Sequence, residues 1–137
     1  MPGWMVCVVV LTAATAFGLV RAGRDGRMRV PTTDGAVRLS EAELGGALGE
    51  RATLVQFSTA FCQPCRATRR VLAEVAGMVD GVAHLEVDAE DRLELVRRLD
   101  VRRTPTVLVL DGEGLVVRRA AGMPRKADVI AALGRAL

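Results

Sequence analysis

Hydrophobic and polar positions divide the chain into two regions of different pattern. Residues 4–20 form one apolar stretch without a charged side chain, and charged and apolar positions then intermingle from residue 36 onward. In this second region, short apolar runs typical of buried strands alternate with segments whose apolar positions recur every three or four residues, as in amphipathic helices. The pattern predicts strands over 36–39, 53–58, 81–88, 105–110 and 115–120, and helices over 41–49, from the cysteines to Met78, over 91–99 and over 128–137.

This order of elements predicts an α/β fold. Strands separated by a helix are expected to run in parallel, whereas the turn Asp111-Gly112-Glu113-Gly114 predicts an antiparallel hairpin between the last two strands. The expected result is a mixed central sheet with helices on both faces. Ser40 and Glu43 have the spacing of a capping box, which marks the place where the helix over 41–49 begins.

The apolar stretch over residues 4–20 is long enough, at roughly 25 Å as a helix, to form a short membrane span. A buried helix of a soluble domain would show a polar stripe, and only two threonines interrupt this one. A cleaved signal peptide is an alternative, because Ala14-Thr15-Ala16 resembles a cleavage site, but no Lys or Arg precedes the stretch. Cys7 lies too early for a lipoprotein signal. We therefore predict an uncleaved transmembrane anchor over residues 1–21, in a single-pass protein of the cell membrane.

The positive charge of the chain lies directly after the apolar stretch. The formal net charge is +3, and one short segment accounts for all of it. That segment contains Arg21, Arg24, Arg27 and Arg29, with Asp25 among them. From residue 22 on, it belongs to a region rich in Gly, Arg, Pro and Thr, which predicts a linker over 22–35 before a folded domain over 36–137. Because the domain is neutral and poor in aromatic residues, we predict no nucleic-acid partner.

The strand over 53–58 is followed by Cys62-Gln63-Pro64-Cys65, a pair of cysteines three residues apart. A zinc site would need two further Cys or His ligands, and the chain offers only His84 and the membrane-embedded Cys7. No metal site is therefore predicted. A purely structural disulfide is also disfavoured, because so short a loop restrains little of the unfolded chain.

The cysteine pair is better suited to thiol–disulfide exchange. Cys62 falls near the N-cap of the following helix, where free backbone N–H groups and the helix dipole stabilise a thiolate. Pro64 fits the first helical turn, where its missing N–H costs nothing. Cys65, one turn further on, is shielded but close enough to resolve a mixed disulfide on Cys62. We therefore predict that Cys62 is the nucleophile and Cys65 the resolving cysteine.

At these residues the region over 36–137 resembles the thioredoxin family. The stretch Phe61-Cys62-Gln63-Pro64-Cys65 corresponds to the W-C-G-P-C centre of that family, Thr104-Pro105 to its cis-proline loop, and Gly122 to a glycine lining its substrate groove. A C-x-x-C motif alone is a weak signal. Its combination with a Thr-Pro about forty residues later and with this strand order is specific.

The resemblance implies a thioredoxin-like fold and a thiol–disulfide oxidoreductase. The catalytic set that it implies comprises Cys62, Cys65, Pro64, Thr104 and Pro105. Phe61 and Gly122 are implied to line the substrate groove, and the Thr104–Pro105 peptide bond is expected to be cis and to face the disulfide. No cofactor is implied beyond the redox-active disulfide between Cys62 and Cys65. The implied partners are protein thiols or disulfides, and a reductase or another electron donor.

Several positions depart from the family pattern. The buried acid that the family places six residues before its first cysteine is here Gln56, and the lysine that pairs with that acid is replaced by His84. Phe61 stands in place of a tryptophan, and Ser58 in place of another aromatic residue. Because Gln cannot titrate, the usual proton relay is missing. His84 is either an ordinary strand residue or a substitute base for Cys65.

Two functions of different classes remain open. The first is an oxidoreductase, which we expect to act as a reductant because Gln63-Pro64 keeps the proline found in reducing members of the family and contains no histidine. The second is a module that binds a partner or carries a soft ion such as Cu(I) on the two cysteines without turnover. A Met or His ligand near the cysteines would favour the second, and Met28 and Met123 are the candidates.

The side of the membrane follows from the arginines that flank the apolar stretch. Positively charged residues next to a span stay in the cytoplasm, and here they all follow residues 4–20. This distribution predicts a cytoplasmic domain. Most membrane-tethered redox domains comparable with this one face outward, so an extracytoplasmic domain is the alternative.

Overall fold

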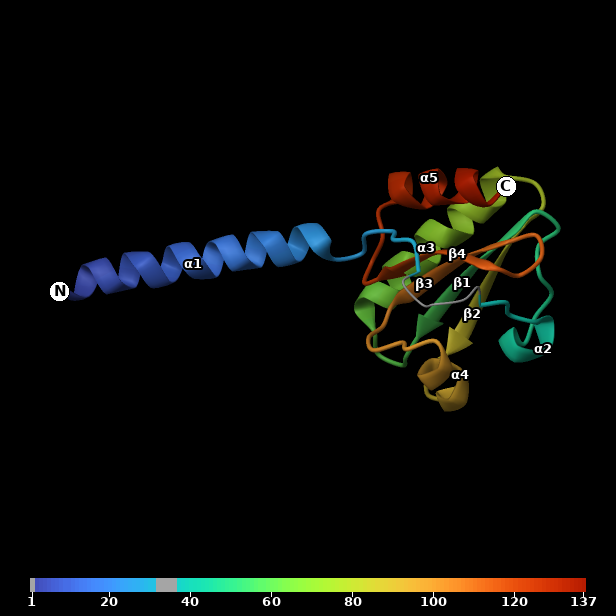
Figure 1. Ribbon diagram of the computed structural model, residues 1–137, viewed down its shortest axis with the longest axis horizontal. Coiled ribbons are helices and arrows are strands. Elements are labelled where there is room, and N and C mark those ends of the chain that lie inside the picture. The colour runs from blue at the N-terminus through green and yellow to red at the C-terminus, as the bar shows by residue number, and fades with distance from the viewer. Residues whose placement is uncertain (1, 32–36) are drawn as a thin grey trace.

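The N-terminal helix stands apart from the rest of the molecule. The computed structural model describes residues 2–31 and 37–137. Helix α1 (Gly3–Arg24) projects away from the folded domain, and none of its residues is buried (Figure 1). Within the described residues it is the one helix whose length and composition would let it cross a membrane. It extends three residues beyond the anchor predicted over 1–21.

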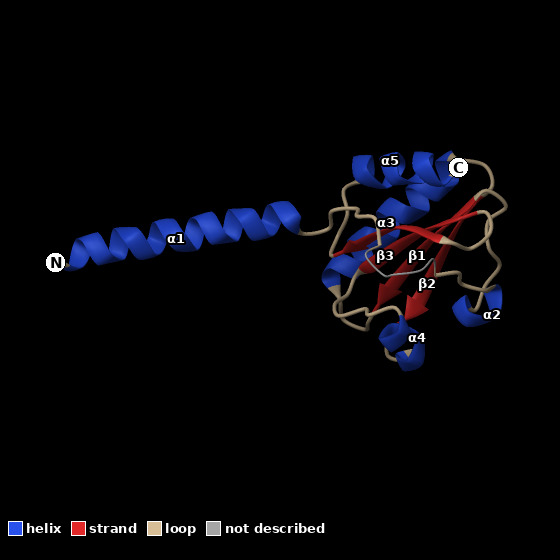
Figure 2. Ribbon diagram, viewed as in Figure 1, coloured by secondary structure: helices blue, strands red, loops and turns tan. Residues whose placement is uncertain are grey.

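The folded domain is a mixed sheet between two pairs of helices. After α1 the elements are α2 (Glu41–Leu44), β1 (Ala52–Ser58), α3 (Gln63–Met78), β2 (Val82–Asp88), α4 (Leu93–Arg98), β3 (Thr106–Asp111), β4 (Val116–Ala121) and α5 (Lys126–Ala136). In the described part of the chain the sheet has four strands in the order β2-β1-β3-β4. Helices α3 and α5 cover one face, and the short helices α2 and α4 lie on the other side (Figure 2). The predicted α/β class is confirmed, and the fold is thioredoxin-like.

One strand direction differs from the prediction. Strands β1 and β2 are parallel as expected, but β3 runs antiparallel to β1 although a helix precedes it. A helix that crosses back to begin a parallel strand must span the length of the sheet. The seven residues of β2 extend about 23 Å, whereas the six residues of α4 extend about 9 Å. Strand β3 therefore begins at the end of the sheet where β2 finished, and it runs in the direction opposite to β1 and β2.

Two apolar clusters hold the layers together, one on each face of the sheet. Every residue of β1 is buried, because this central strand is covered on both sides. Its alternate side chains enter different clusters. On the α3 and α5 side the buried members include Leu54, Leu72, Val75, Val107, Val109, Val129 and Leu133. On the α2 and α4 side they include Leu39, Leu44, Val55, Phe57, Leu95, Leu108 and Leu110.

The strand predicted over 36–39 is wrong. Its first residue lies outside the described part of the chain, and the rest forms an isolated antiparallel bridge between Arg38 and Leu115. The N–H of Leu39 also donates a hydrogen bond to the Gly114 carbonyl, at 2.9 Å. The segment therefore meets the β3–β4 hairpin at its turn and does not follow a strand along its length.

The helix predicted over 41–49 ends early, at Leu44. Its capping box is confirmed: the Glu43 N–H donates to Ser40 Oγ at 3.3 Å, and the Ser40 N–H donates to the Glu43 carboxylate at 2.9 Å. Gly45 then adopts a left-handed conformation with φ 73° and ends the helix. The remaining predicted helix and strand boundaries agree with the structure to within two residues.

The region predicted as a linker is partly docked on the domain. The Gly26 N–H donates to the Ala121 carbonyl at 2.9 Å, and Arg29 forms an isolated antiparallel bridge with Arg119. This segment therefore lies against β4 and is held there by backbone hydrogen bonds. Gly26 has φ 71°, and a Cβ atom there would lie 1.9 Å from the Met123 carbonyl oxygen. Only glycine allows so close an approach.

Candidate functional site

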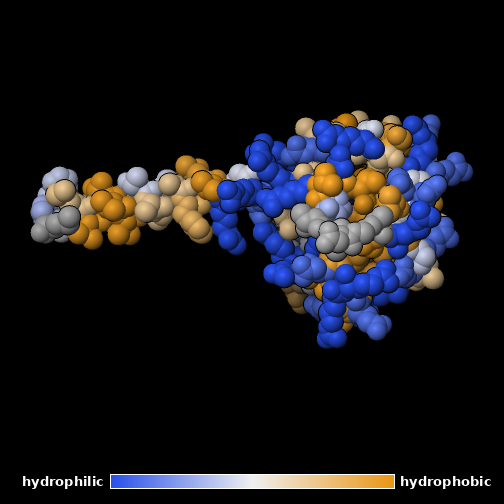
Figure 3. Space-filling view, in the orientation of Figure 1, coloured by the Kyte–Doolittle hydropathy of each residue, from blue (hydrophilic) through white to orange (hydrophobic). Residues whose placement is uncertain are grey.

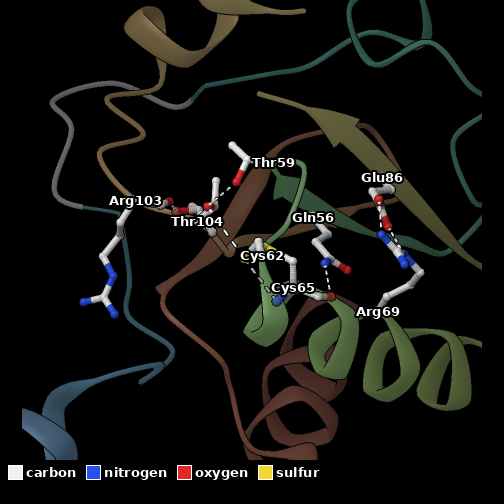
Figure 4. The surroundings of a disulfide bond; sticks show 9 residues. Gln56, Thr59, Cys62, Cys65, Arg69, Glu86, Arg103 and Thr104 are labelled. Carbon is white, nitrogen blue, oxygen red and sulfur yellow. Dashed lines mark hydrogen bonds and ion pairs between the residues drawn. A yellow bond between two sulfur atoms is a disulfide. The ribbon is translucent and has the colours of Figure 1, made fainter. Parts of the chain in front are cut away.

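The two cysteines lie where strand β1 gives way to helix α3. Cys62 is the N-cap of α3, and its Sγ accepts a hydrogen bond from the Cys65 backbone N–H at 3.2 Å (Figure 4). Pro64 occupies the first turn, as predicted. Cys62 and Cys65 are joined by a disulfide. The helix N-terminus thus directs its free backbone donors at the sulfur atom of the outer cysteine.

The two sulfur-bearing residues differ in their exposure. Cys65 is 1% exposed, whereas Cys62 is only partly buried. The residue before them, Phe61, is 98% exposed and has φ 62°, in the left-handed region that few non-glycine residues adopt. This conformation turns the chain sharply from β1 into α3. It leaves an aromatic ring in solvent next to the accessible cysteine.

The loop predicted to face the disulfide does so. The Thr104–Pro105 peptide bond is cis, which confirms the expectation. Thr104 Oγ1 lies 3.9 Å from Cys62 Sγ and 3.2 Å from Thr59 Oγ1 (Figure 4). Pro105 is buried, and its carbonyl accepts a hydrogen bond of 2.8 Å from the Gly122 N–H. Gly122, which directly follows β4, is therefore placed beside this loop.

Gln56 lies directly beneath the inner cysteine. Its side chain is fully buried in β1, and Nε2 donates a hydrogen bond of 2.7 Å to the Cys65 carbonyl (Figure 4). Its Oε1 atom is buried and has no hydrogen-bond partner among the described residues. The residue that replaces the family's buried acid thus binds the backbone of Cys65 and offers no titratable group.

His84 lies on the same face of the sheet as Gln56 but makes no hydrogen bond to it or to either cysteine among the described contacts. In the parallel pairing of β1 and β2, His84 lies opposite Leu54. Two residues further along each strand, on the same face, Glu86 lies opposite Gln56. Burial lowers the pKa of His84, Glu86 acts to raise it, and Arg69 acts to lower it. Its Nε2 atom is buried without a partner among the described residues. Burial therefore favours the neutral form of the imidazole.

The sequence did not predict an ion pair between α3 and the residue of β2 that lies opposite Gln56. Arg69 from α3 binds the Glu86 carboxylate through two nitrogens, with Nη2 at 2.6 Å from Oε1 (Figure 4). The hydrogen bond from Arg69 holds the pKa of Glu86 below its usual value, and burial opposes this. The sequence places Arg69 on a solvated helix face. The register of β1 and β2 sets Glu86 opposite Gln56, and this pairing cannot be read from the sequence.

A second missed contact connects the docked linker with the loop that carries Thr104. Arg103 forms an ion pair with Asp25. A Cβ atom on Gly122 would lie 2.8 Å from the Asp25 carboxylate and 3.0 Å from Arg103. The absence of a side chain at Gly122 therefore makes room for this pair. No sequence signal links Asp25 to Arg103, because they lie in different elements.

The two methionines named as candidate ligands for a soft metal lie in different surroundings. Met28 packs against the apolar cluster under α5, and Met123 is 48% exposed on the loop before α5. Among the described residues, no group of three or more His, Cys, Asp or Glu side chains is placed to hold a metal ion. Cys7 is exposed and belongs to α1, the helix that projects away from the folded domain (Figure 1).

Comparisons with known proteins agree with this geometry. The thioredoxin family model matches residues 37–135. The chain is 35% identical over 69 residues to Thioredoxin H2-1 of Oryza sativa subsp. japonica, a match that covers 50% of this chain and 49% of that protein. It is 32% identical over 60 residues to Thioredoxin H5 of the same plant, which covers 44% of each. The chain thus spans less than half the length of these two relatives.

A solved structure shows the same fold. Chloroplastic thioredoxin z superposes with a TM-score of 0.59 over 77% of this chain and 96% of its own, at 21% identity. An identity this low is evidence for the fold alone. The family model, by contrast, covers most of the chain and includes the disulfide, the cis-proline loop and Gly122. The chain therefore belongs to the thioredoxin family.

Proposed function

We propose that this protein is a membrane-anchored thiol–disulfide oxidoreductase that works through Cys62 and Cys65. The observation that carries the proposal is the placement of the two sulfurs. A partly exposed Cys62 caps helix α3 and faces Thr104. The buried Cys65 lies one turn further along the helix and is joined to Cys62 by a disulfide. This arrangement allows one cysteine to meet a substrate and the other to release it.

The proposed exchange begins with the dithiol form. The Cys62 thiolate attacks one sulfur of a substrate disulfide, a mixed disulfide forms, and the second substrate sulfur leaves as a thiolate that takes up a proton. Cys65 then loses its proton and attacks Cys62 Sγ, which releases the first substrate sulfur as a second thiol. Two electrons and two protons pass to the substrate, and the Cys62–Cys65 disulfide remains.

The surrounding residues are suited to orient a polypeptide substrate. The cis Thr104–Pro105 loop can pair through its backbone with an extended strand laid beside the disulfide. The exposed ring of Phe61 offers an apolar contact beside Cys62. The Gly122 N–H holds the Pro105 carbonyl through a backbone hydrogen bond of 2.8 Å. In this proposal the substrates are protein thiols or disulfides, and a separate reductase or other donor returns electrons to the pair.

The fate of the Cys65 proton differs from that in relatives with a buried acid. Gln56 can bind the Cys65 backbone but cannot accept its proton. His84 shares the sheet face of Gln56, is kept neutral by burial, and has a nitrogen without a partner among the described residues. In this proposal His84 accepts that proton through an intervening water.

The direction of electron flow is proposed to be reductive. Gln63-Pro64 places a proline and no histidine between the cysteines. A histidine in this pair would stabilise the thiolate further and favour an oxidant. The proposed role is therefore that of a reductant that rests as a dithiol.

The anchor is proposed to be helix α1, with residues 4–20 in the bilayer. No residue of α1 is buried, and its basic residues lie in the last turn. This flank favours a cytoplasmic domain. The test is labelling of intact cells, after mild reduction, with a membrane-impermeant thiol reagent on a Cys7→Ser chain. Labelling of Cys62 only after the cells are opened supports the cytoplasmic side, and labelling in intact cells contradicts it.

Trapping of substrates tests the redox function. A Cys65→Ser chain cannot resolve a mixed disulfide, so it should accumulate covalent complexes with its partners that dithiothreitol releases. A Cys62→Ser chain, made like the first variant in the Cys7→Ser background, should accumulate none, because its remaining cysteine, Cys65, is buried. Equal trapping by both variants would contradict the assignment of Cys62 as nucleophile. Absence of trapping by either would contradict an oxidoreductase.

A further inference from the structure

Four arginines follow the apolar part of helix α1 in close succession. Arg21 and Arg24 lie in its last turn, and Arg27 and Arg29 in the docked segment beyond it. All four are exposed. In the part of the chain that the structure describes, their side chains form neither a hydrogen bond nor an ion pair. Their charge is therefore not neutralised by the protein itself.

These arginines surround a cavity at the junction of helix and domain. It has a volume of about 460 Å³ and lies between the end of α1 and strand β4. Phe17 and Val20 of α1 form an apolar part of its wall. The four arginines line it together with Arg103 and Arg119 of the folded domain. Figure 3 shows the apolar surface of α1 giving way to hydrophilic surface where the helix meets the domain.

The charged groups contributed by the domain are already engaged. Arg103 is paired with Asp25, the acidic residue of the lining, and Arg119 donates to the backbone carbonyls of Leu99 and Asp100. The cavity therefore keeps a surplus of guanidinium groups after its one carboxylate is paired. A guanidinium binds a phosphate group through two parallel hydrogen bonds, and several of them around one cavity are suited to an anionic phosphate ester.

We propose that this cavity binds the phosphate head group of an anionic phospholipid. A free phosphate ion would satisfy the arginines but would leave Phe17 and Val20 without a partner. A phospholipid supplies both parts, since its glycerol and upper acyl carbons meet apolar side chains next to the charged group. The inference rests on the proposed anchoring of α1, which would set the end of the apolar residues, and hence this cavity, in the head-group layer.

The cavity is connected to the redox site through one residue. Arg103 lines the cavity and directly precedes Thr104, whose hydroxyl lies 3.9 Å from Cys62 Sγ. The bound lipid would thus hold the base of the cis-proline loop at the membrane surface. Residues 26–29, which follow α1, are docked on β4 by backbone hydrogen bonds, so the domain cannot move far from the head-group layer.

Native mass spectrometry of the purified full-length chain in detergent micelles tests the site. Phosphatidylglycerol and phosphatidylcholine with the same acyl chains are added separately, and inorganic phosphate is added in a third arm. We expect a one-to-one complex with phosphatidylglycerol, at least about fivefold more than with phosphatidylcholine. This complex should weaken as ionic strength rises. Equal binding of the two lipids, or equal occupancy by inorganic phosphate, would overturn the proposal.

A matched pair of triple variants identifies the residues. Arg24→Gln, Arg27→Gln and Arg29→Gln together should reduce phosphatidylglycerol binding by about tenfold or more. Arg21 is retained so that the flank of the span stays positive. The control combines Arg70→Gln, Arg97→Gln and Arg125→Gln, three exposed arginines away from the cavity, and should bind as the unmodified chain does. Equal losses in the two triple variants would show only an effect of net charge and would overturn the proposed site.

Alkaline extraction of membranes separates this proposal from the anchoring on which it rests. A chain released by extraction contradicts the anchor. A chain that stays in the membrane but shows no preference for phosphatidylglycerol contradicts the lipid site alone. The lysine variant Arg24→Lys, Arg27→Lys, Arg29→Lys keeps the charge, so it should bind more lipid than the glutamine variant. Lysine and glutamine variants that bind equally poorly would overturn recognition by charge.

Discussion

The side-chain amide of Gln56 donates a hydrogen bond of 2.7 Å to the backbone carbonyl of Cys65. The contact fixes the first turn of α3 against the central strand and holds the inner cysteine in place. It uses a neutral amide at a position where a carboxyl group would titrate. The consequences of that choice for stability and for turnover can be measured separately.

Replacement of Gln56 by aspartate is expected to trade stability for rate. Burial raises the pKa of a carboxyl group placed there, because few groups nearby stabilise its charge. Above that pKa the buried charge costs free energy, so the melting temperature of Gln56→Asp should fall by several degrees as the pH rises from acidic to neutral. The rate of protein disulfide reduction near neutral pH should rise severalfold, because Cys65 gains a proton acceptor.

The control for this change is Gln56→Asn, which has the shape of aspartate without its charge. It should lose stability through the shortened side chain but show no added dependence on pH. Thermal unfolding followed by circular dichroism and a turbidity assay of insulin reduction measure the two effects. If aspartate and asparagine behaved alike in both assays, a carboxyl at position 56 would have no role beneath Cys65.

His84 is expected to make stability depend on pH below its usual pKa of 6.5. Burial lowers the pKa of His84 in the folded protein, so between the folded value and 6.5 the unfolded chain binds more protons. Stability should therefore rise with pH through this window and be lost as the pH falls. In a His84→Gln chain the curve of unfolding free energy against pH should be flatter there. Parallel curves for the two chains would contradict a buried neutral imidazole.

The same variant tests the proposed proton transfer. If His84 accepts the proton of Cys65, the rate of disulfide reduction in the unmodified chain should fall as His84 becomes protonated, below pH 6.5. In His84→Gln this dependence should disappear and the rate at neutral pH should fall by about tenfold. A rate and pH profile unchanged by the substitution would leave His84 as a strand residue only.

Features set by residues close together in sequence were predictable. The N-cap position of Cys62, the place of Pro64 in the first turn and the capping box of Ser40 and Glu43 each depend on neighbours within four positions. The cis Thr104–Pro105 bond followed from the family resemblance. The strand β1 was recognisable because burial on both faces demands a nearly continuous apolar run.

Features that depend on the register between distant elements were not predictable. The direction of β3 follows from the shortness of α4, and the helix predicted there was three residues longer. The pairing of Arg69 with Glu86 requires knowledge of which residue of β2 faces the second turn of α3. The docking of residues 26–29 on β4 could not be read from a sequence rich in turn-forming residues, which is equally typical of a free linker.

Glu43 is expected to stabilise the contact between α2 and α4 in a pH-dependent way. The hydrogen bond from Arg98, with help from the Ser40 backbone N–H, lowers the pKa of Glu43 from 4.5 to about 2. Its stabilising effect is therefore complete above pH 4.5 and is lost as the pH falls through the window from 4.5 to about 2. Glu43→Gln should cost about 1 kcal/mol at neutral pH, allowing for its partial exposure to solvent.

Urea unfolding at neutral pH and at pH values within that window measures the effect of Glu43. The matched control is Glu113→Gln, which removes an ion pair between Arg38 and Glu113 whose side chains are 62% and 74% exposed. A surface pair of this kind should change the free energy of unfolding by less than about 0.5 kcal/mol. Equal losses for the two variants at neutral pH would contradict a special role of Glu43.

The docked segment after α1 is expected to depend on the absence of a side chain at residue 26. A Cβ atom on Gly26 would overlap the Met123 carbonyl oxygen, and its φ of 71° strains any other residue. Gly26→Ala should therefore release the segment from β4 while the domain stays folded. The Arg119 amide, which donates to the Arg29 carbonyl at 2.8 Å, should then exchange its hydrogen faster. Gly134→Ala is the control, because nothing lies within 4 Å of a Cβ atom there and its helical site should gain about 0.5–1 kcal/mol. Hydrogen exchange over 116–121 that is unchanged in Gly26→Ala, or that is equally fast in both variants, would show that residues 26–29 are not docked on β4.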